Sequence, residues 1–421
     1  MTFVKRFYAP SETATAMMLT GVAERLAREG FEVTVITSRA SQPRREVRAG
    51  VHVHRVATTR LSHLGLWGRL VDYAAFAIAA TWAVLWQTRA GDVVVSKTDP
   101  PLIGLVIGPA ARFKRATVVH WLQDLFPEAV EAASLVTSPV RARCVQALTR
   151  LRDRELGKAD GIVAIGRNMQ SRLPAATRGR ARCFVIPNTA DGEVIKPVPL
   201  RRSRRLTVGY CGTLGRMHDV ETLHRAIDAT TSPDRNIDWR FVGGGVGMTS
   251  LKQAFAERAL PSVSFAPSQP SSQVSQMLGE MDVHIVSLRA EADGISLPSK
   301  LYGILAAGRP VVFIGPPESE IAQLIASYDL GVAIDNGNAD ALVGALTAFA
   351  DDRERIVRQG QNGRALFEKT YDRETVTASW IDLLHEMADR EPAPAKPEPA
   401  ADYRPDALAS SVSKIVRRYC P

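Results

Sequence analysis

The sequence has few cysteines, and their spacing matches neither a metal site nor a disulfide framework. Only four of its 421 residues are cysteine, namely Cys144, Cys183, Cys211 and Cys420. The opening segment also lacks the features of a secretory signal, because the apolar stretch at residues 3–8 is short and charged. Both absences predict a reduced, cytoplasmic protein.

Long apolar runs are scarce as well. The longest such stretch, residues 73–86, is about 14 residues long, whereas a membrane-spanning helix needs about 20. We therefore expect a buried helix here. The alternative is a helix that lies at a membrane surface, with Trp67, Trp82 and Trp86 at the lipid–water interface.

Acidic residues are outnumbered, with 44 Asp and Glu against 53 Lys and Arg, which leaves a net charge of +9. The basic excess is concentrated in residues 139–182 and 201–205. It predicts either a solvated arginine-rich surface or attraction to an anionic partner, such as lipid headgroups or a phosphorylated substrate. We expect peripheral contact with an anionic membrane and no nucleic acid partner, since no recognition motif accompanies the charge.

The sequence does contain an alternation of strand and helix patterns along most of its length. This alternation predicts an α/β protein of two doubly wound, Rossmann-like domains with parallel sheets. Proline and arginine crowd residues 196–205, so we expect the domains at 1–197 and 198–370. A helix at 371–389 is expected to pack back toward the first domain. A flexible Pro/Ala-rich tail with a possible short amphipathic helix is expected at 390–421.

Strands are expected where short runs of β-branched and aromatic residues lie between turn residues. In the first domain they are residues 2–8, 31–37, 51–56, 92–96, 116–122, 161–165 and 183–188. In the second they are residues 206–211, 239–243, 263–266, 283–288, 311–314 and 331–334. Helices are expected at residues 14–28, 140–156 and 373–389, among others.

The most informative segment is residues 297–312. It predicts a polar turn, a short helix that carries Lys300, a glycine stop at Gly308 and a strand from Val311. A lysine at a helix start, beside free backbone N–H groups, predicts a site for a phosphate or diphosphate.

A second turn of this kind covers residues 210–216 and ends in Arg216. Gly212 and Gly215 in this turn let the backbone approach phosphates closely. Because two cationic strand-to-helix turns occur in one half of the chain, we expect that half to hold a nucleotide. No Asp-x-Asp element follows a strand, so we expect no essential metal.

Asp124 follows an apolar strand, at the edge of the sheet where ligands bind in such folds. A carboxylate there can orient or deprotonate a hydroxyl group, or it can cap the following turn. His120, in the middle of the same strand, is expected to be a core histidine. The three glycines Gly243, Gly244 and Gly245 indicate either contact with a base or a simple turn.

Several segments, in the same order, resemble family 4 retaining glycosyltransferases. The resemblance is strongest to enzymes of bacterial exopolysaccharide and O-antigen synthesis, which include colanic-acid-type enzymes. It covers residues 2–388. The segments that carry it are residues 7–10, 30–35, 99–101, 124–128, 186–191, 210–219, 241–245, 298–302 and 306–311.

The resemblance implies a GT-B fold, in which two Rossmann-like domains face each other across a cleft. It implies a UDP- or GDP-sugar donor in the C-terminal domain and no cofactor. A polyprenyl-diphosphate-linked saccharide would be the acceptor in the N-terminal domain, at the inner face of the cell membrane. Sugar transfer would proceed with retention, in surface polysaccharide biosynthesis.

The resemblance also assigns residues to roles, in agreement with the need for cations on the leaving diphosphate. The expected catalytic residues are Asp124, Arg216 and Lys300. The expected donor-binding residues are Gly212, Gly215, Arg216, His218, Gly243, Gly244, Gly245, Glu291, Ser299, Lys300 and Leu301.

The sequence departs from the family at some positions. Ile295 and Gly303 replace two glutamates that are usual there, and Thr222 stands where a lysine is usual. Glu291 or Asp293 would then contact the sugar. Two other functions stay open, namely a sugar-nucleotide 2-epimerase on the same fold and a non-catalytic scaffold protein that lacks the glutamate pair.

Overall fold

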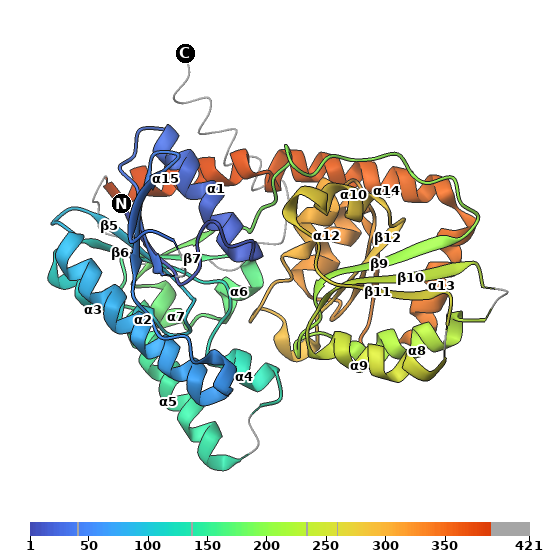
Figure 1. The fold of residues 1–421 in the computed structure, drawn as a ribbon, viewed down its shortest axis with the longest axis horizontal. Coiled ribbons are helices and arrows are strands. Elements are labelled where there is room, and N and C mark those ends of the chain that lie inside the picture. The colour runs from blue at the N-terminus through green and yellow to red at the C-terminus, as the bar shows by residue number, and fades with distance from the viewer. Residues whose placement is uncertain (40–41, 136–137, 233–234, 259, 389–421) are drawn as a thin grey trace. The chain divides into compact units, whose positions relative to one another are not determined.

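The computed structural model describes residues 1–39, 42–135, 138–232, 235–258 and 260–388 (Figure 1). Its contacts divide the chain into two compact units, which are described separately. Unit 1 contains Met1–Pro187, Gly294–Leu297 and the described residues from Thr377 onward, and unit 2 contains Asn188–Asp293 and Pro298–Val376. The division after Pro187 falls earlier than the boundary expected after residue 197. The expected tail at 390–421 lies outside the described residues.

Unit 1 is built on an eight-stranded sheet. Its strands are β1 (Thr2–Val4), β2 (Thr34–Ser38), β3 (Arg45–Arg48), β4 (Val51–Val56), β5 (Val93–Lys97), β6 (Thr117–Trp121), β7 (Gly161–Ala164) and β8 (Arg182–Val185). Their order is β3-β4-β2-β1-β5-β6-β7-β8, and only the β3–β4 pair is antiparallel. The winding reverses between β1 and β5, so the carboxyl ends of these two strands mark a ligand-binding position.

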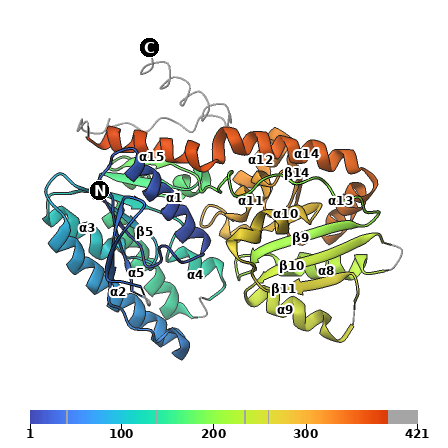
Figure 2. The same ribbon diagram turned by 45° about the horizontal axis from the view of Figure 1, so that its top comes forward.

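Helices cover both faces of this sheet (Figures 1 and 2). They are α1 (Ala14–Arg28), α2 (Leu66–Gln87), α3 (Gly104–Phe113), α4 (Glu128–Ala132), α5 (Pro139–Leu156), α6 (Arg167–Arg172), α7 (Ala175–Arg178) and part of α15 (Arg373–Ala388). Helix α3 packs against both α2 and α5, which together form a layer on one face. Helices α1 and α15 lie on the opposite face (Figure 2).

An aromatic cluster joins α15 to the core of unit 1. The ring centroid of Trp380 in α15 lies 6.0 Å from that of Phe3 and 4.5 Å from that of Trp121. All three side chains are buried. Aromatic rings in tilted or edge-on contact stabilise one another beyond the burial of their area, so residues near the end of the chain complete a core that begins at β1.

Unit 2 has a six-stranded sheet in which all neighbouring strands are parallel. The strands are β9 (Leu206–Thr213), β10 (Ile237–Gly244), β11 (Val263–Ala266), β12 (Val283–Ser287), β13 (Val311–Ile314) and β14 (Gly331–Ile334). Their order is β11-β10-β9-β12-β13-β14. The winding reverses between β9 and β12, which places a second ligand-binding position at their carboxyl ends.

The helices of unit 2 are α8 (Val220–Thr230), α9 (Val246–Phe255), α10 (Val274–Gly279), α11 (Lys300–Ala306), α12 (Glu320–Tyr328), α13 (Ala339–Asp351) and α14 (Arg353–Leu366). Helices α8, α9 and α13 cover one face of the sheet, and α11, α12 and α14 cover the other (Figure 1). Apolar side chains of β9, β10 and β12 pack with α8, α9 and α13 in the main hydrophobic core.

The structure corrects two expectations for unit 1. The first strand, expected through residue 8, ends at Val4, and Tyr8 instead belongs to the loop before α1. The apolar segment forms a helix of 22 residues, α2, which is buried on one face only. The expectation of a fully buried helix is wrong for its other face, where Trp67, Trp82 and Trp86 are exposed.

Candidate functional site

Lys300 is the first residue of α11 and its side chain reaches the end of β9. Its Nζ donates to the hydroxyl of Tyr210 and to the carbonyl of Thr213 at 3.4 Å, and lies 3.8 Å from the centroid of the Tyr210 ring. Burial lowers the pKa of Lys300 to about 7, because a charge is poorly solvated there. A bound anion would stabilise the protonated form, so this lysine is suited to hold a phosphate.

Glycines let the ends of β9 and β10 pack backbone against backbone. Gly212, Gly243 and Gly245 have φ angles of 112°, 134° and 107°, which favour glycine. A Cβ atom on Gly243 would lie 2.2 Å from the carbonyl oxygen of Gly212. Another on Gly245 would lie 2.6 Å from the carbonyl oxygen of Leu214. Gly243 and Gly245 therefore admit no side chain without movement of the backbone.

Gly215 and Gly244 differ from Gly243 and Gly245, because a Cβ atom there would meet no close neighbour. No heavy atom lies within 4 Å of the position of a Cβ on Gly244, and the nearest to one on Gly215 is His218 Cδ2 at 3.9 Å. The backbone at these two positions can be approached by a ligand.

His218 is held between the ends of β9 and β12. Its Nδ1 lies 2.5 Å from the carbonyl oxygen of Ser287, so Nδ1 carries the proton and donates. Burial, together with the charge of Lys300, lowers the pKa of His218 to about 3. The imidazole is therefore neutral near pH 7, and its Nε2 is left as an acceptor.

Asp219 caps α8. Its Oδ1 accepts the Thr222 amide at 3.0 Å, and its Oδ2 accepts the Thr222 hydroxyl at 2.6 Å and the Asn336 side-chain amide at 3.0 Å. Burial acts to raise the pKa of Asp219, but these hydrogen bonds outweigh it and the pKa is lowered. Thr222, where the resemblance led us to expect a lysine, is fully buried in this capping network.

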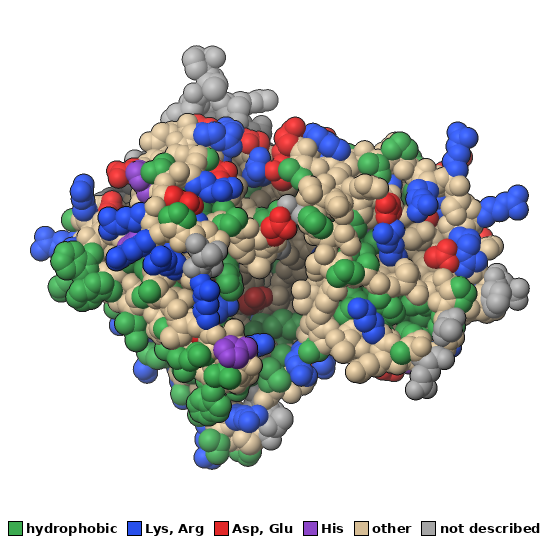
Figure 3. Space-filling model, viewed as in Figure 1, with side chains coloured by type: hydrophobic (Ala, Val, Ile, Leu, Met, Phe, Trp, Pro, Cys, Tyr) green, Lys and Arg blue, Asp and Glu red, His purple; other side chains and the backbone are tan. Residues whose placement is uncertain are grey.

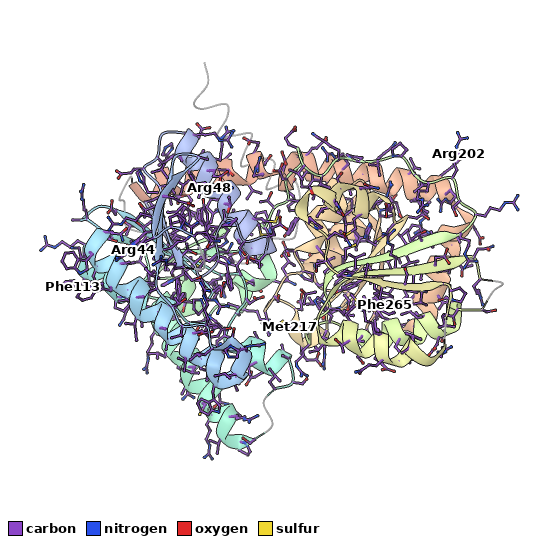
Figure 4. The ribbon with its side chains drawn as sticks, in the orientation of Figure 1. Arg44, Arg48, Phe113, Arg202, Met217 and Phe265 are labelled. Atoms are coloured by element: carbon purple, nitrogen blue, oxygen red, sulfur yellow. The ribbon has the colours of Figure 1, made fainter. Side chains whose placement is uncertain are left out.

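Arg216 and Glu291 lie on two loops that touch. The amide of Arg289, after β12, donates to the carbonyl of Met217 at 2.8 Å, in the loop that also carries Arg216 (Figure 4). Glu291 is exposed and pairs with Arg289 Nε at 3.3 Å. The Arg216 side chain is exposed, and within the described part of the chain it has no hydrogen bond or ion pair. It is therefore available to an anionic ligand.

Ser299 and Leu301 flank Lys300 but differ in setting. Ser299 occupies the position before α11, is partly exposed and makes no capping hydrogen bond with its side chain. Leu301 is buried, and its amide donates to the Pro298 carbonyl at 3.2 Å. Leu301 therefore offers a ligand neither its side chain nor a free amide.

The positions of the two missing glutamates differ in setting. Ile295 is buried, and its carbonyl oxygen accepts the Leu125 amide at 2.8 Å. A Cβ on Gly303 would meet only the methyl groups of Leu278 and Ile195, at 3.6 and 3.8 Å. A carboxylate stem added at Gly303 would start among these methyl groups.

In unit 1, Asp124 follows β6 at the carboxyl edge of the sheet. It is exposed and forms an isolated antiparallel bridge with Ser296. A small cavity of about 30 Å³ lies beside it, lined also by Ser96, Lys97 and His120. Such a volume holds about one water molecule.

Two buried lysines occupy the carboxyl ends of β1 and β5. Lys5 Nζ lies 3.5 Å from Asp99 Oδ2 and donates to the Thr15 hydroxyl at 2.8 Å. Lys97 Nζ lies 3.7 Å from the centroid of the Trp121 ring and donates to the Thr15 carbonyl at 3.3 Å. Burial lowers the pKa of both lysines. Their partners all come from unit 1, so side chains of the protein already fill this position.

His120 is buried, and its partners are core residues. Its Nδ1 lies 2.6 Å from Ser96 Oγ, and its Nε2 lies 3.6 Å from Glu155, which also pairs with Arg112 at 2.7 Å. These contacts are those of a structural histidine.

The site residues expected in the second half of the chain come together in unit 2, except that Leu301 turns into the core. Asp124 belongs to unit 1. Sequence reasoning missed Tyr210 and Ser287 as partners of Lys300 and His218, although both lie near the carboxyl ends of their strands, where ligands bind. Within the described residues, no three His, Cys, Asp or Glu side chains are grouped to hold a metal ion.

The chain matches two families of known proteins. Residues 13–189 match the glycosyl transferase 4-like domain, and residues 191–366 match the glycosyl transferases group 1. Together the two matches cover most of the described residues.

Two curated relatives are similar in sequence. The putative colanic acid biosynthesis glycosyl transferase WcaI of Escherichia coli (strain K12) is 24% identical over 412 residues, which cover 89% of this chain and 97% of WcaI. The probable glycosyltransferase WbjE of Pseudomonas aeruginosa is 26% identical over 258 residues, which cover 58% of this chain and 62% of WbjE. The match to WbjE thus spans less than two thirds of that protein.

Solved structures share the fold. Sucrose-phosphate synthase from Thermosynechococcus elongatus has a TM-score of 0.73 at 16% identity, with 92% of this chain and 98% of that chain covered. Anabaena HepE in complex with UDP and glucose has a TM-score of 0.65 at 16% identity, with 91% of this chain and 99% of that chain covered.

Two Rossmann-like α/β units, with sheets that are parallel apart from one edge pair, form the GT-B fold, and both matched families are glycosyltransferases. The matched families and relatives then narrow the class. The chain belongs to the family 4 glycosyltransferases of polysaccharide biosynthesis.

Proposed function

We propose that this protein transfers a sugar, with retention, from a UDP- or GDP-sugar to a polyprenyl-diphosphate-linked saccharide at the inner face of the cell membrane. The observation that carries the proposal is the location of Lys300. It lies beside the glycine turn at the end of β9, where the winding of the unit 2 sheet reverses. The description of HepE in complex with UDP and glucose supports a nucleotide-sugar donor.

In this proposal the diphosphate of the donor lies at the ends of β9 and β12. Lys300, whose ammonium is poorly solvated in the free protein, gains an anionic partner there, and the unpartnered Arg216 provides a second positive charge. As the bond between the sugar and the diphosphate breaks, negative charge grows on the leaving oxygen. Fixed cations stabilise that charge more than they stabilise the intact donor.

The remaining groups position the reactants. The neutral His218 presents Nε2 as an acceptor for a sugar hydroxyl, and the exposed Asp124 of unit 1 orients or deprotonates the acceptor hydroxyl. The new bond joins the acceptor oxygen to the anomeric carbon. Asp124 or the departing diphosphate receives the acceptor proton.

The test is thermal stabilisation by a panel of nucleotide diphosphates and nucleotide sugars. We expect one nucleotide to raise the melting temperature of the wild type, because a ligand that binds only the folded state stabilises it. The same nucleotide should have little effect on Lys300→Ala. Lys252→Ala, which removes an exposed lysine of α9 in the same unit, should respond like the wild type.

Two outcomes would favour the other functions. If no nucleotide at millimolar concentration stabilises the wild type, the scaffold function, to which the absent glutamates at Ile295 and Gly303 also point, replaces the enzyme. If a nucleotide sugar is converted to its 2-epimer without an acceptor, the protein is the epimerase.

A further inference from the structure

The six tryptophans of the chain fall into two classes. Trp121, Trp239 and Trp380 are buried, with at most 2% of each side chain exposed. The other three are 79%, 64% and 73% exposed, and all of them lie on α2: Trp67, Trp82 and Trp86. Tryptophan side chains are rarely so exposed to solvent, so three exposed tryptophans on one helix indicate an interaction surface.

Exposed apolar residues of α2 form a continuous stripe. Trp67, Val71, Ala74, Ile78, Trp82 and Trp86 follow one another at intervals of three or four residues, and all are exposed. This spacing places them on a single face of the helix. At 1.5 Å per residue the stripe is roughly 28 Å long. We call this stripe the α2 face.

The opposite side of α2 is occupied by the protein itself. Phe76, Ala80 and Val84 are fully buried, where α2 packs on β2, β4 and α3. By length and composition α2 is apolar enough to cross a membrane. Because one side is committed to the core of unit 1, however, the helix can present only its other side to lipid while the unit is folded.

Exposed apolar side chains continue from α2 onto its neighbour α3. Phe113 at the end of α3 is 80% exposed and projects from the fold (Figure 4), and Val106 is 40% exposed. Figure 3 shows hydrophobic side chains gathered over these two helices, with basic side chains beside them. The apolar surface is therefore wider than a single helix.

The exposed charged side chains of α2 and α3 are basic. Helices α2 and α3, which are described in full, contain a single acidic residue, Asp72. It is buried and accepts hydrogen bonds from the Thr59 hydroxyl and the Leu61 amide. Arg69, Arg89 and Arg115, on or just after these helices, are exposed. Apolar side chains flanked by cations match the surface of an anionic bilayer.

We propose that the α2 face docks unit 1 onto an anionic lipid bilayer, with α2 parallel to the membrane plane. The tryptophan rings lie at the level of the headgroups, where an apolar body and a polar N–H are both satisfied. The arginines contact the anionic headgroups. This inference rests on the proposed function, because an enzyme that acts on a lipid-linked acceptor has to bind at the membrane surface.

The first test is co-sedimentation of the full chain with phosphatidylcholine vesicles that contain or lack phosphatidylglycerol. We expect the wild type to sediment with the anionic vesicles and less so at high salt. The variant Trp67→Ser/Trp82→Ser/Trp86→Ser should lose at least about tenfold in partitioning, because each exposed ring contributes buried apolar area. The control Val246→Ser/Val357→Ser, which removes exposed apolar residues of unit 2, should bind as the wild type does.

A second test uses the tryptophans as reporters. Fluorescence of the wild type should shift to shorter wavelength on anionic vesicles and be quenched by brominated lipid, while the triple variant retains only its buried, unquenched rings. An unchanged melting temperature of the triple variant shows that it is folded, as expected from the exposure of all three side chains.

Three results would overturn the proposal. They are equal sedimentation of wild type and triple variant, absence of wild-type binding to anionic vesicles, and a concentration-dependent dimer that the triple variant abolishes. The last result would assign the α2 face to a second copy of the chain. None of these measurements uses a nucleotide sugar, so they can fail while nucleotide stabilisation succeeds, and the reverse also holds.

Discussion

The sheets of both units reverse their winding at one point, but the two units use that point differently. In unit 1 the ends of β1 and β5 carry Lys5 and Lys97, both 1% exposed and enclosed by Thr15, Asp99 and Trp121. In unit 2 glycine turns follow β9 and β10, and Lys300, at the start of α11, remains partly exposed beside the end of β9.

A lysine at a strand end therefore has two different uses in one chain. Where side chains of the protein surround the ammonium, it belongs to the core. Where a glycine leaves the backbone open, as at Gly212, whose Cβ position lies 3.8 Å from Lys300 Cε, the lysine remains available to an anion. The rule that ligands bind where the winding of a sheet reverses identifies the binding position in each unit. The local packing decides whether side chains of the protein already fill that position.

The largest expected effect concerns the charge of Lys300. Because its pKa is about 7, the protonated form is lost as the pH rises, and donor affinity should fall by up to about 50-fold between pH 7 and pH 9. Isothermal titration across this range measures it. Lys300→Arg keeps its charge throughout and should show a flat profile. A flat wild-type profile would mean that Lys300 does not hold the diphosphate.

The glycine turns give the next effect. Gly243→Ala should lower the free energy of unfolding by about 2 kcal/mol or more, because the new Cβ would meet the Gly212 carbonyl and the φ angle is unfavourable. Gly244→Ala, next to it, has open space and should cost less than about 1 kcal/mol. Urea unfolding monitored by circular dichroism compares the two. Equal losses would contradict the tight packing of the turns.

The smallest effect concerns Lys97. Burial lowers the pKa of Lys97 in the folded state, so the unfolded chain binds the proton more readily. The free energy of unfolding of the wild type should therefore increase as the pH rises toward 10.5, the ordinary pKa of a lysine. Lys97→Met lacks this dependence and should be as stable as the wild type or slightly more stable near pH 7. Thermal unfolding at pH 7 and 9.5 tests this, with the exposed Lys252→Met as control. A loss of donor affinity in Lys97→Met would instead tie this lysine to the site.

The first and last residues of helices and strands with a regular hydrophobic pattern could be predicted from the sequence. The helix Ala14–Arg28 and the strands Val51–Val56 and Val311–Ile314 have the expected bounds, because period and flanking turn residues agree there. Strand β3 was not expected. Its sequence, Arg-Glu-Val-Arg, is largely charged and exposed, and pairing with β4 rather than burial makes it a strand.

For the site, the sequence predicts which residues take part better than it predicts the contacts between them. Lys300, the glycine turns and the capping of α8 by Asp219 follow from local pattern, whereas the hydrogen bond from Asn336 to Asp219 joins residues that are distant in the sequence. Likewise, the sequence pattern of an apolar helix such as α2 is the same whether its outer face contacts protein or solvent. Only the tertiary packing separates the two.

The segment Gly294–Leu297 has a consequence for the gene. Its residues belong with unit 1 through the Leu125–Ile295 and Asp124–Ser296 contacts, although the chain on either side belongs to unit 2. Neither unit is therefore encoded by one uninterrupted stretch of DNA. A gene fragment ending at codon 187 would omit both this segment and Trp380 from the core, so exchange of domains between related genes by a single crossover would leave unit 1 incomplete.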